Sequence, residues 1–231
     1  MDSLIASSSE RIATFTCSSE PVAQSLMSRL PLRNVAVIPN GIETFRLQKK
    51  SSLDKTLIFV GNLSYEPNID GVIWFTTTVF PLIRARMGEA RLVVAGSSPS
   101  EAVKKACEGP GISIYPDVRD IARLYQDASV SIVPLRFGSG SRIKILEAAV
   151  HGLPVVSTRK GAQGLGPELQ DAIFISDEDS VAFASACLDC LNDSQASLAR
   201  AAQLQMLVAK HHSRPDVVSR IQHLVMKQIG R

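Results

Sequence analysis

Short apolar runs alternate with longer amphipathic stretches from residue 56 onward, and this alternation predicts repeated β-α units. The apolar runs are four or five residues long, and most lie next to glycine or proline, which is typical of strands buried on both faces. Such strands, separated by helices, predict an α/β fold: a Rossmann-like parallel sheet with helices on both faces. The predicted strands are Thr56–Val60, Arg91–Ala95, Ile112–Tyr115, Val130–Pro134, Pro154–Ser157 and Ala172–Ile175.

Helical spacing fills the segments between these strands. Pro67–Met87 predicts a helix broken at Pro81, because proline lacks the backbone N–H and its ring clashes with the preceding turn. In the predicted helix Val118–Asp127, the apolar side chains of Ile121, Leu124 and Tyr125 share one face. Further helices are predicted at Pro99–Cys107, Arg142–Val150 and Ser180–Leu191, and the chain after Asp177 reads as helical with interruptions near Asn192–Ser194 and at Pro215.

A smaller β-α-β unit is predicted at the start of the chain. It consists of a strand at Arg11–Thr16, a helix that begins at Pro21 and ends near Leu30, and a strand at Asn34–Ile38. The polar segment Lys49–Asp54 is the predicted linker to the larger sheet.

The stretch Phe137–Leu165 holds the strongest functional signal. A glycine-rich turn precedes a helix that carries Arg142, Lys144 and Glu147, and a second glycine-rich loop follows the next strand. Helix N-termini attract phosphate because their backbone N–H groups are unpaired and carry a partial positive charge. A carboxylate on the same helix can accept two hydrogen bonds from a vicinal diol such as a ribose. Together these features predict a nucleoside diphosphate at the carboxyl edge of the sheet.

This stretch resembles the donor-binding core of retaining glycosyltransferases of the family 4 (group 1) type, which have the GT-B fold. The family pattern is roughly G-x-G-x-(R/K)-x-K-x-L-E-A-x-A-x-G-x-P-V-V-S-T-x-x-G-x-E-G-L. Five ordered blocks over about residues 12–190 carry the resemblance, so it is far more specific than a lone G-x-G. The blocks are the stretch itself, IPNGIE (Ile38–Glu43), FVGNLSYEPNIDGVIWF (Phe59–Phe75), VVAG (Val93–Gly96) and DASVSIVPL (Asp127–Leu135).

The resemblance implies roles for individual residues. Glu147 matches the second acid of the family's E-x7-E motif, which contacts the donor's ribose; the alternative is an ordinary Lys144–Glu147 surface pair. The first acid of that motif falls at Ser139, which leaves the transferred sugar unidentified. The backbone of the turn Gly138, Ser139 and Gly140 is expected to face the sugar or the β-phosphate.

Basic groups neutralise the diphosphate in this family, commonly from an arginine after the first strand, where this chain has Asn62. We therefore expect Arg142 or Lys144 to do this in place of a metal ion, with Arg142 swinging toward a phosphate and Lys144 on the ribose side. Gly61 is expected to let the backbone approach the phosphates, although a simple strand-to-loop glycine is an equal alternative. The loop around Val118 is expected to face the base, which leaves uridine and guanosine both open.

Family members have two Rossmann-like domains, and only about 40 residues precede the IPNGIE block. We expect residues 1–45 to be a remnant of the N-terminal domain, 46–200 the nucleotide-sugar-binding domain, and 201–231 helices that cross back through a face containing Ile221, Leu224, Val225 and Gln228. The chain would then be a truncated donor-binding half, or one partnered by a separate acceptor-domain polypeptide. The exposed domain face predicts poor solubility or self-association.

Composition narrows the class of partner and the location. The chain has 231 residues, 45% of them apolar, and a formal charge of +3 without a long basic run, so nucleic acid is not the expected partner. With neither a membrane-spanning stretch nor a signal peptide, it reads as cytoplasmic, with peripheral contact to the inner membrane as an alternative. Cys187 and Cys190 are interpreted as ordinary helix cysteines, and we assign no role to the four histidines.

The leading hypothesis is therefore the donor-binding portion of an enzyme that passes a hexose from a UDP- or GDP-sugar to an acceptor hydroxyl with retention, without a metal or other cofactor. The alternative is a non-catalytic nucleotide-sugar-binding or regulatory subunit, favoured by the incomplete E-x7-E. A nicotinamide dehydrogenase is disfavoured, because the first strand of the sheet ends in GNLSYEPN where G-x-G-x-x-G would be needed.

Overall fold

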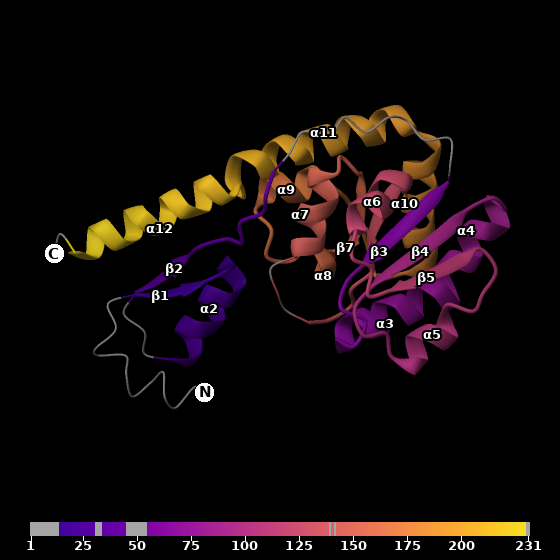
Figure 1. Ribbon diagram of the computed structural model, residues 1–231, viewed down its shortest axis with the longest axis horizontal. Helices are drawn as coiled ribbons and strands as arrows, with labels where there is room; N and C mark the ends of the chain where they lie inside the picture. The colour runs from indigo at the N-terminus through magenta and orange to yellow at the C-terminus, as the bar shows by residue number, and fades with distance from the viewer. Residues whose placement is uncertain (1–13, 31–33, 45–54, 139, 141, 230–231) are drawn as a thin grey trace.

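The computed structural model describes residues 14–30, 34–44, 55–138, 140 and 142–229 (Figure 1). Its central element is a six-stranded sheet in the order β5-β4-β3-β6-β7-β8, in which every neighbouring pair is parallel. The prediction of an α/β fold built on a parallel sheet is confirmed. The strands are β3 (Thr56–Val60), β4 (Arg91–Gly96), β5 (Ile112–Pro116), β6 (Val130–Val133), β7 (Val155–Thr158) and β8 (Phe174–Ser176).

Alternate residues of the strands enter two separate cores, one on each face of the sheet. In β3, Leu57 and Phe59 pack into the first core, whereas Ile58 packs into the second. Helices cover both faces, as Figure 1 shows, which explains why the central strands β3, β6 and β7 are buried along nearly their whole length, whereas the edge strand β5 is partly exposed. The first core is closed by α3 (Glu66–Trp74), η1 (Phe75–Val79), α4 (Phe80–Arg86), α5 (Glu101–Ala106) and α10 (Ser180–Asn192), and the second by α6 (Ile121–Asp127), α7 (Ile143–Val150), α9 (Pro167–Asp171) and α11 (Ser194–His211).

The helix that contains Pro81 is not broken there, which corrects the prediction. It continues from α3 through the single wide π-helical turn of η1 into α4, and the N–H of Phe80 bonds to the carbonyl of Phe75. Threonine hydroxyls at 76, 77 and 78 donate to carbonyls of the preceding turn. The wider turn accommodates a proline that cannot donate, so the helix stays continuous.

The start of one helix and the content of one loop also differ from the prediction. Helix α6 begins at Ile121 and not at Val118, because Asp120 caps it by accepting from the N–H of Ala122 at 3.1 Å. The glycine-rich loop after β7 contains two short helices that the pattern did not reveal, α8 (Arg159–Ala162) and α9. They hold four and five residues, which is too short for an apolar period to be recognised.

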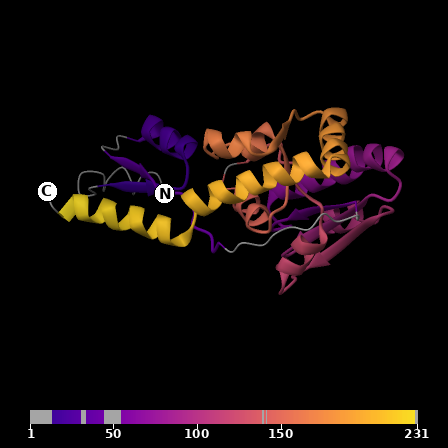
Figure 2. The same cartoon turned by 90° about the horizontal axis from the view of Figure 1, so that it is seen from above.

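The N-terminal unit is a two-stranded parallel sheet of β1 (Phe15–Cys17) and β2 (Val35–Val37), joined by α2 (Glu20–Arg29). The final helix α12 (Arg214–Ile229) runs alongside this unit in both Figure 1 and Figure 2. The amide of Gln228 donates to the hydroxyl of Thr14 at 2.9 Å. Residues 11–13 of the predicted first strand and the predicted linker lie outside the described residues.

The predicted domain boundary at residue 201 falls inside α11, whose Leu204 and Val208 are fully buried in the second core. Only α12 therefore leaves the sheet. Of the face expected to lean on the N-terminal unit, Leu224 and Gln228 are half-buried, whereas Ile221 and Val225 are exposed. Self-association through the exposed domain face stays a prediction.

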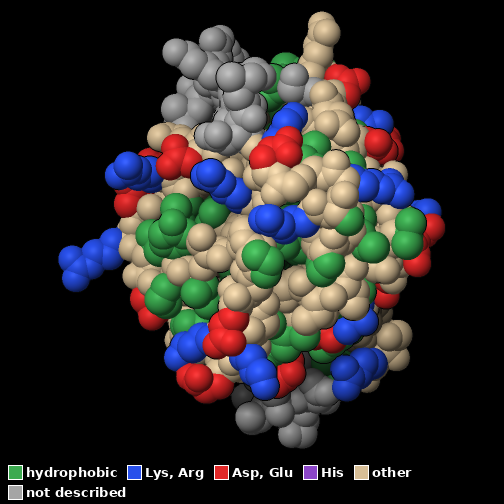
Figure 3. Space-filling view, turned by 90° about the vertical axis from the view of Figure 1, so that its right-hand side faces the viewer, with side chains coloured by type: hydrophobic (Ala, Val, Ile, Leu, Met, Phe, Trp, Pro, Cys, Tyr) green, Lys and Arg blue, Asp and Glu red, His purple; other side chains and the backbone are tan. Residues whose placement is uncertain are grey.

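The surface shows no sorting of charge that would indicate a polyanion partner on the face in Figure 3, where basic and acidic side chains are interspersed. Among the described residues, no helix is both long and apolar enough to cross a membrane.

Gly71 gives a first prediction, because it brings α3 against the end of β6. A Cβ at this position would lie 2.7 Å from the carbonyl oxygen of Pro134. We expect Gly71→Ala to lower the free energy of unfolding by about 1–3 kcal/mol through overpacking. Gly88→Ala is the matched control, since a Cβ there meets nothing within 4 Å and should change stability by less than about 1 kcal/mol. Urea unfolding of both variants tests this, and equal effects would contradict the packing argument.

Candidate functional site

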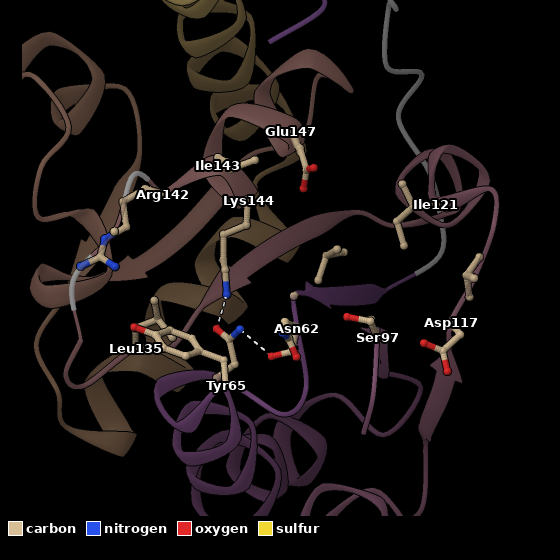
Figure 4. Close-up of a pocket in the computed structure, with 16 residues that line it drawn as sticks. Asn62, Tyr65, Ser97, Asp117, Ile121, Leu135, Arg142, Ile143, Lys144 and Glu147 are labelled. Carbon is tan, nitrogen blue, oxygen red and sulfur yellow. Dashed lines mark hydrogen bonds between the residues drawn. The ribbon is translucent and has the colours of Figure 1, made fainter. Parts of the chain in front are cut away.

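A cavity of about 550 Å³ opens at the carboxyl ends of the central strands (Figure 4). The strand order reverses between β3 and β6, and open α/β sheets bind ligands at such a switch point. The loops after β3, β4 and β6 meet here. The lining residues are Val60, Gly61, Asn62, Tyr65, Asn68, Gly96, Ser97, Asp117, Val118, Ile121, Leu135, Gly140, Arg142, Ile143, Lys144 and Glu147.

Lys144 projects from the first turn of α7 toward the end of β3. Its Nζ donates to Oδ1 of Asn68 at 2.7 Å and lies 4.2 Å from the centre of the Phe59 ring. Burial of the ammonium and the nearby charge of Arg142 lower the pKa of Lys144 to about 7, although Glu147 acts in the opposite direction. The cavity therefore holds a cation that gains from an anionic partner.

Gly61 keeps the space beside this ammonium open. A Cβ on Gly61 would lie 2.9 Å from Nδ2 of Asn68 and 3.1 Å from Nζ of Lys144. A larger residue at this position would displace one of these side chains from its place at the cavity. The backbone at the end of β3 is thus exposed to the cavity.

Asn68 is a site residue that the sequence reasoning missed. It is buried, accepts from Lys144 and donates through Nδ2 to the carbonyl oxygen of Asn62 at 2.7 Å. The signal was its place just after Pro67 at the start of a helix that follows the first strand of the sheet. Asn62 lines the cavity, but its side chain is engaged locally, where Oδ1 accepts from the N–H and hydroxyl of Ser64.

Glu147 lies one turn further along α7 than Lys144 and also faces the cavity (Figure 4). Its carboxylate accepts a hydrogen bond of 3.3 Å from the hydroxyl of Tyr125, which is fully buried in α6. Burial raises the pKa of Glu147, and the hydrogen bond from Tyr125 and the charge of Lys144 partly offset this rise. Since Lys144 donates to Asn68 and Glu147 accepts from Tyr125, the alternative of a simple surface pair does not describe them.

Tyr125 is a second residue that sequence reasoning did not assign to the site. Its ring stacks on the imidazole of His151 at 4.7 Å between centroids and 11° between planes. The apolar face of α6 predicted its burial, but only the packing of α6 against α7 places its hydroxyl on Glu147.

Arg142 was expected to reach a phosphate, but its side chain bonds to backbone carbonyls of a neighbouring loop. The residue is 7% exposed, and its guanidinium donates to the carbonyls of Gln163 at 3.1 Å and Lys160 at 2.7 Å. In Figure 4 this group points away from Lys144 and toward the neighbouring loop. An arginine near the start of a helix was predicted to swing to a phosphate; here its Nε and one of its two terminal nitrogens donate to backbone carbonyls. Lys144 is the cation that faces the cavity centre.

The glycine-rich turn before α7 reaches the cavity through Gly140, whose φ of 139° suits glycine. Gly138 is not among the lining residues and packs against Pro67. Ser139 lies outside the described residues. At the opposite end, Val118 lines the cavity as predicted beside Asp117, whose carboxylate accepts from the N–H of Ser98 at 3.2 Å.

The remaining candidates do not add to this site. Cys187 and Cys190 are free and buried in α10, and burial raises the pKa of both thiols, as ordinary core cysteines would show. By composition, the acidic sequence Asp177-Glu178-Asp179 is a candidate metal site. Its two aspartates have other roles, because Asp177 pairs with Arg159 and Asp179 caps α10. In the described part of the chain, no group of three acidic, histidine or cysteine side chains could hold a metal ion.

Comparisons with known proteins agree with this geometry. A family model described as glycosyl transferases group 1 matches residues 54–193, which contain the whole cavity. An uncharacterized 44.6 kDa protein in the cps region of Klebsiella pneumoniae is 30% identical over 148 residues, which are 61% of this chain and 38% of that protein.

Solved structures resemble the chain over nearly its full length. TarM of S. aureus, in a complex that includes UDP, has a TM-score of 0.80 at 13% identity over 96% of this chain and 45% of TarM. The sucrose-phosphate synthase of Thermosynechococcus elongatus has a TM-score of 0.75 at 16% identity over 99% of this chain and 61% of the synthase. The pneumococcal O-GlcNAc transferase GtfA, in complex with UDP and GlcNAc, has a TM-score of 0.72 at 14% identity over 99% of this chain and 47% of GtfA.

These likenesses establish a fold shared with GT-B glycosyltransferases. The chain spans 38% of the length of the curated relative and 45% to 61% of the three structures.

Proposed function

Because the chain belongs to the group 1 glycosyl transferases, we propose that it is the donor-binding portion of a retaining, family 4-type enzyme that transfers a hexose from a UDP- or GDP-sugar to an acceptor hydroxyl. The observation that carries this proposal is that Lys144 and Glu147 face the same cavity from one helix, with Lys144 close to the backbone of Gly61. A cation beside exposed backbone suits a diphosphate, and a carboxylate one turn away suits a ribose diol.

The order of groups along the cavity supports one orientation of the donor. Ile121 lies at one end of the cavity, Glu147 and Lys144 follow, and Arg142 lies at the other end (Figure 4). Val118, three residues before Ile121, also lines the cavity and gives that end an apolar wall that suits a base, and the lining residue Gly140 stands two residues before Arg142. A nucleoside diphosphate sugar laid along this line would place its ribose at Glu147, its phosphates at Lys144 and Gly61, and its sugar at Gly140. This orientation agrees with the general rule that ligands lie outside the carboxyl ends of the strands.

Leaving-group stabilisation falls to Lys144 in this proposal. The departing nucleoside diphosphate develops negative charge at its β-phosphate, and a cation held in place beforehand stabilises that charge without reorganisation. Asn68 holds the ammonium from the other side, so the group is positioned before the donor binds. Charge neutralisation by Lys144 needs no metal ion, and metal independence is part of the proposal.

Residues beyond this cavity complete the enzyme in our proposal. Among the described residues, the N-terminal unit contributes two strands and one helix, so we propose that an acceptor site needs further protein, in the same polypeptide or in a separate one. A cytoplasmic location, with or without peripheral contact to a membrane, is likewise proposed. The sugar and the acceptor are open.

A non-catalytic nucleotide-sugar-binding or regulatory subunit is the second candidate. It is favoured by the residue at position 139, which is a serine where the E-x7-E motif has its first acid. Both candidates bind a nucleotide. Only the enzyme would transfer sugar once an acceptor domain is supplied, so reconstitution with such a domain separates them.

Thermal unfolding of the purified chain with UDP, GDP or ADP tests nucleotide binding directly. A ligand present at about 100 times its dissociation constant adds about 2.7 kcal/mol to the free energy of unfolding. Stabilisation by one nucleotide would identify the base. A folded protein that none of the three stabilises would contradict the donor-binding proposal.

Tyr125→Phe gives a further prediction, because its hydroxyl donates to the carboxylate that is proposed to hold the ribose. This donation lowers the pKa of Glu147, so its removal raises that pKa further and leaves the carboxylate less firmly held. We expect nucleotide affinity to fall about 3- to 10-fold near neutral pH, the effect of one lost hydrogen bond. The loss of affinity on acidification should also begin at a higher pH than in the wild type. Calorimetric titrations at several pH values measure both effects, and an unchanged pH profile would contradict the role of Tyr125.

A further inference from the structure

Arg142 is the one strongly basic residue of the cavity wall whose charge the proposed chemistry does not use. Its guanidinium donates to three backbone carbonyls, those of Lys160 at 2.7 Å, Gln163 at 3.1 Å and Gly138 at 3.5 Å. Burial lowers the pKa of the group, but an arginine stays protonated in proteins, so a full charge is held at these carbonyl dipoles.

The three carbonyls belong to two different loops. Gly138 lies in the turn before α7, whereas Lys160 and Gln163 lie in and just after α8, 18 and 21 residues further along the chain than Arg142. The planar guanidinium carries five N–H donors in a fixed fork, so one side chain can serve acceptors on both loops. An ammonium could not reproduce this arrangement.

The two loops approach each other beside the proposed sugar position. A Cβ on Gly164 would lie 3.9 Å from the carbonyl oxygen of Gly140, and Gly140 lines the cavity. Arg142 itself has a φ of 54°, a left-handed conformation that is uncommon for a residue with a side chain. A residue is held in such a conformation only when its surroundings determine it, and the three hydrogen bonds do so here.

We propose that Arg142 is a positioning residue: it ties the loop 160–164 to the turn that contains Gly140 and thereby shapes the sugar end of the cavity. It acts through these loops and does not bind a phosphate, which Lys144 does. The part of this inference that concerns the sugar rests on the proposed function, whereas the joining of the loops does not.

Hydrogen exchange without any ligand tests the joining of the loops. The N–H groups of Gln163 and Leu165 bond to the carbonyls of Lys160 and Ala162 within the tied loop. In Arg142→Met we expect these two amides to exchange about tenfold faster than in the wild type, because the loop opens more often. Arg136→Met is the matched control: Arg136 lies between β6 and α7 as well, but pairs with Asp70, and its loss should leave both amides unchanged.

Arg142→Lys keeps the charge, and it tests whether Arg142 joins the two loops if the methionine variant fails to fold. A lysine reaches fewer of the carbonyls, so the two amides should exchange at a rate between those of the wild type and a released loop. Exchange that is unchanged in the variant or variants that fold would overturn the proposal.

Binding titrations test the role at the sugar end. The phosphate increment is the ratio of the dissociation constants of the nucleoside and its diphosphate; the sugar increment is the ratio for the diphosphate and its glucose or N-acetylglucosamine conjugate. Arg142→Met should reduce the sugar increment about tenfold and keep the phosphate increment, and Arg142→Lys should restore part of the former. If Arg142→Met loses the phosphate increment while the exchange of the two amides is unchanged, Arg142 is a phosphate ligand. If the sugar increment of the wild type is near one, Arg142 has no role at the sugar.

If the wild type binds no nucleotide at all, the proposed function fails. The exchange experiment still decides in that case whether Arg142 joins the loops.

Discussion

Lys144→Met is expected to lower the affinity for a nucleoside diphosphate by about 100-fold or more, while the affinity for the free nucleoside changes less than about threefold. The ammonium is the cation that faces the cavity centre, and charge-assisted hydrogen bonds to phosphate contribute about 1.5–3 kcal/mol each. The phosphate increment, the ratio of the dissociation constants of the nucleoside and its diphosphate, should therefore fall toward one. Calorimetric titration with both ligands measures it, and Lys104→Met, on an exposed lysine of α5, is the matched control.

The same variant should change how stability depends on pH. In the folded chain the pKa of Lys144 is about 7, well below its ordinary value, so between these two values the unfolded chain binds more protons. The free energy of unfolding of the wild type should thus rise from pH 7 to about 8.5, above which the buried thiols, whose pKa burial raises, act in the opposite direction. Lys144→Met should lose this rise and be more stable than the wild type at pH 6.5 to 7.

Diphosphate binding should also take up protons. Above pH 7 part of the Lys144 population is neutral, and a bound phosphate favours the charged form, so binding draws a proton from the buffer. Binding enthalpies measured at pH 8 in two buffers of different ionisation enthalpy should differ for the wild type and agree for Lys144→Met. Equal wild-type values, together with an unchanged phosphate increment in the variant, would show that Lys144 does not meet the phosphates.

Glu147→Gln is expected to lower nucleotide affinity by about 10- to 100-fold. The amide keeps the shape of the side chain, but it replaces a carboxylate that can accept charge-assisted hydrogen bonds from both hydroxyls of a ribose. The loss should be equal for the nucleoside and its diphosphate, in contrast to that of Lys144→Met. A 2′-deoxy nucleotide should bind more weakly than its ribose counterpart in the wild type, and this difference should shrink in the variant.

Stability provides a second readout for Glu147. Because burial raises its pKa in the folded chain, the folded state binds more protons above the ordinary carboxyl range, and the wild type loses stability as pH rises through this window. Glu147→Gln removes this loss, so the free protein should be at least as stable as the wild type at neutral pH. Glu101→Gln on the exposed side of α5 serves as control. A variant that binds as tightly as this control would rule out Glu147 as the ribose acid.

The fold could be predicted because its central strands β3, β6 and β7 are buried on both faces. Each strand of the sheet is a run of apolar residues beside glycine, proline or polar residues, and Thr56–Val60 is found in the structure with the predicted bounds. The spacing of apolar residues and the residues that start or end a helix depend only on the nearby sequence, so both can be recognised without the tertiary structure. The same locality explains the errors, because neither the π-helical turn that accommodates Pro81 nor the short helix α8 has a period of its own.

The candidate site also has features that follow from the sequence and features that depend on the tertiary structure. The sequence by itself determined which loops follow the parallel strands, and therefore that Gly61, Val118, Gly140, Lys144 and Glu147 would meet at one edge of the sheet. Only the tertiary structure decided what each charged side chain does there. Arg142 and Lys144 are both basic residues of the same short helical segment, yet one bonds to carbonyls 18 and 21 residues away along the chain and the other to Asn68, 76 residues away. A long side chain can bond to any partner within its reach. Which partners are within reach is decided by other elements of the fold, and these come close only once the sheet has formed.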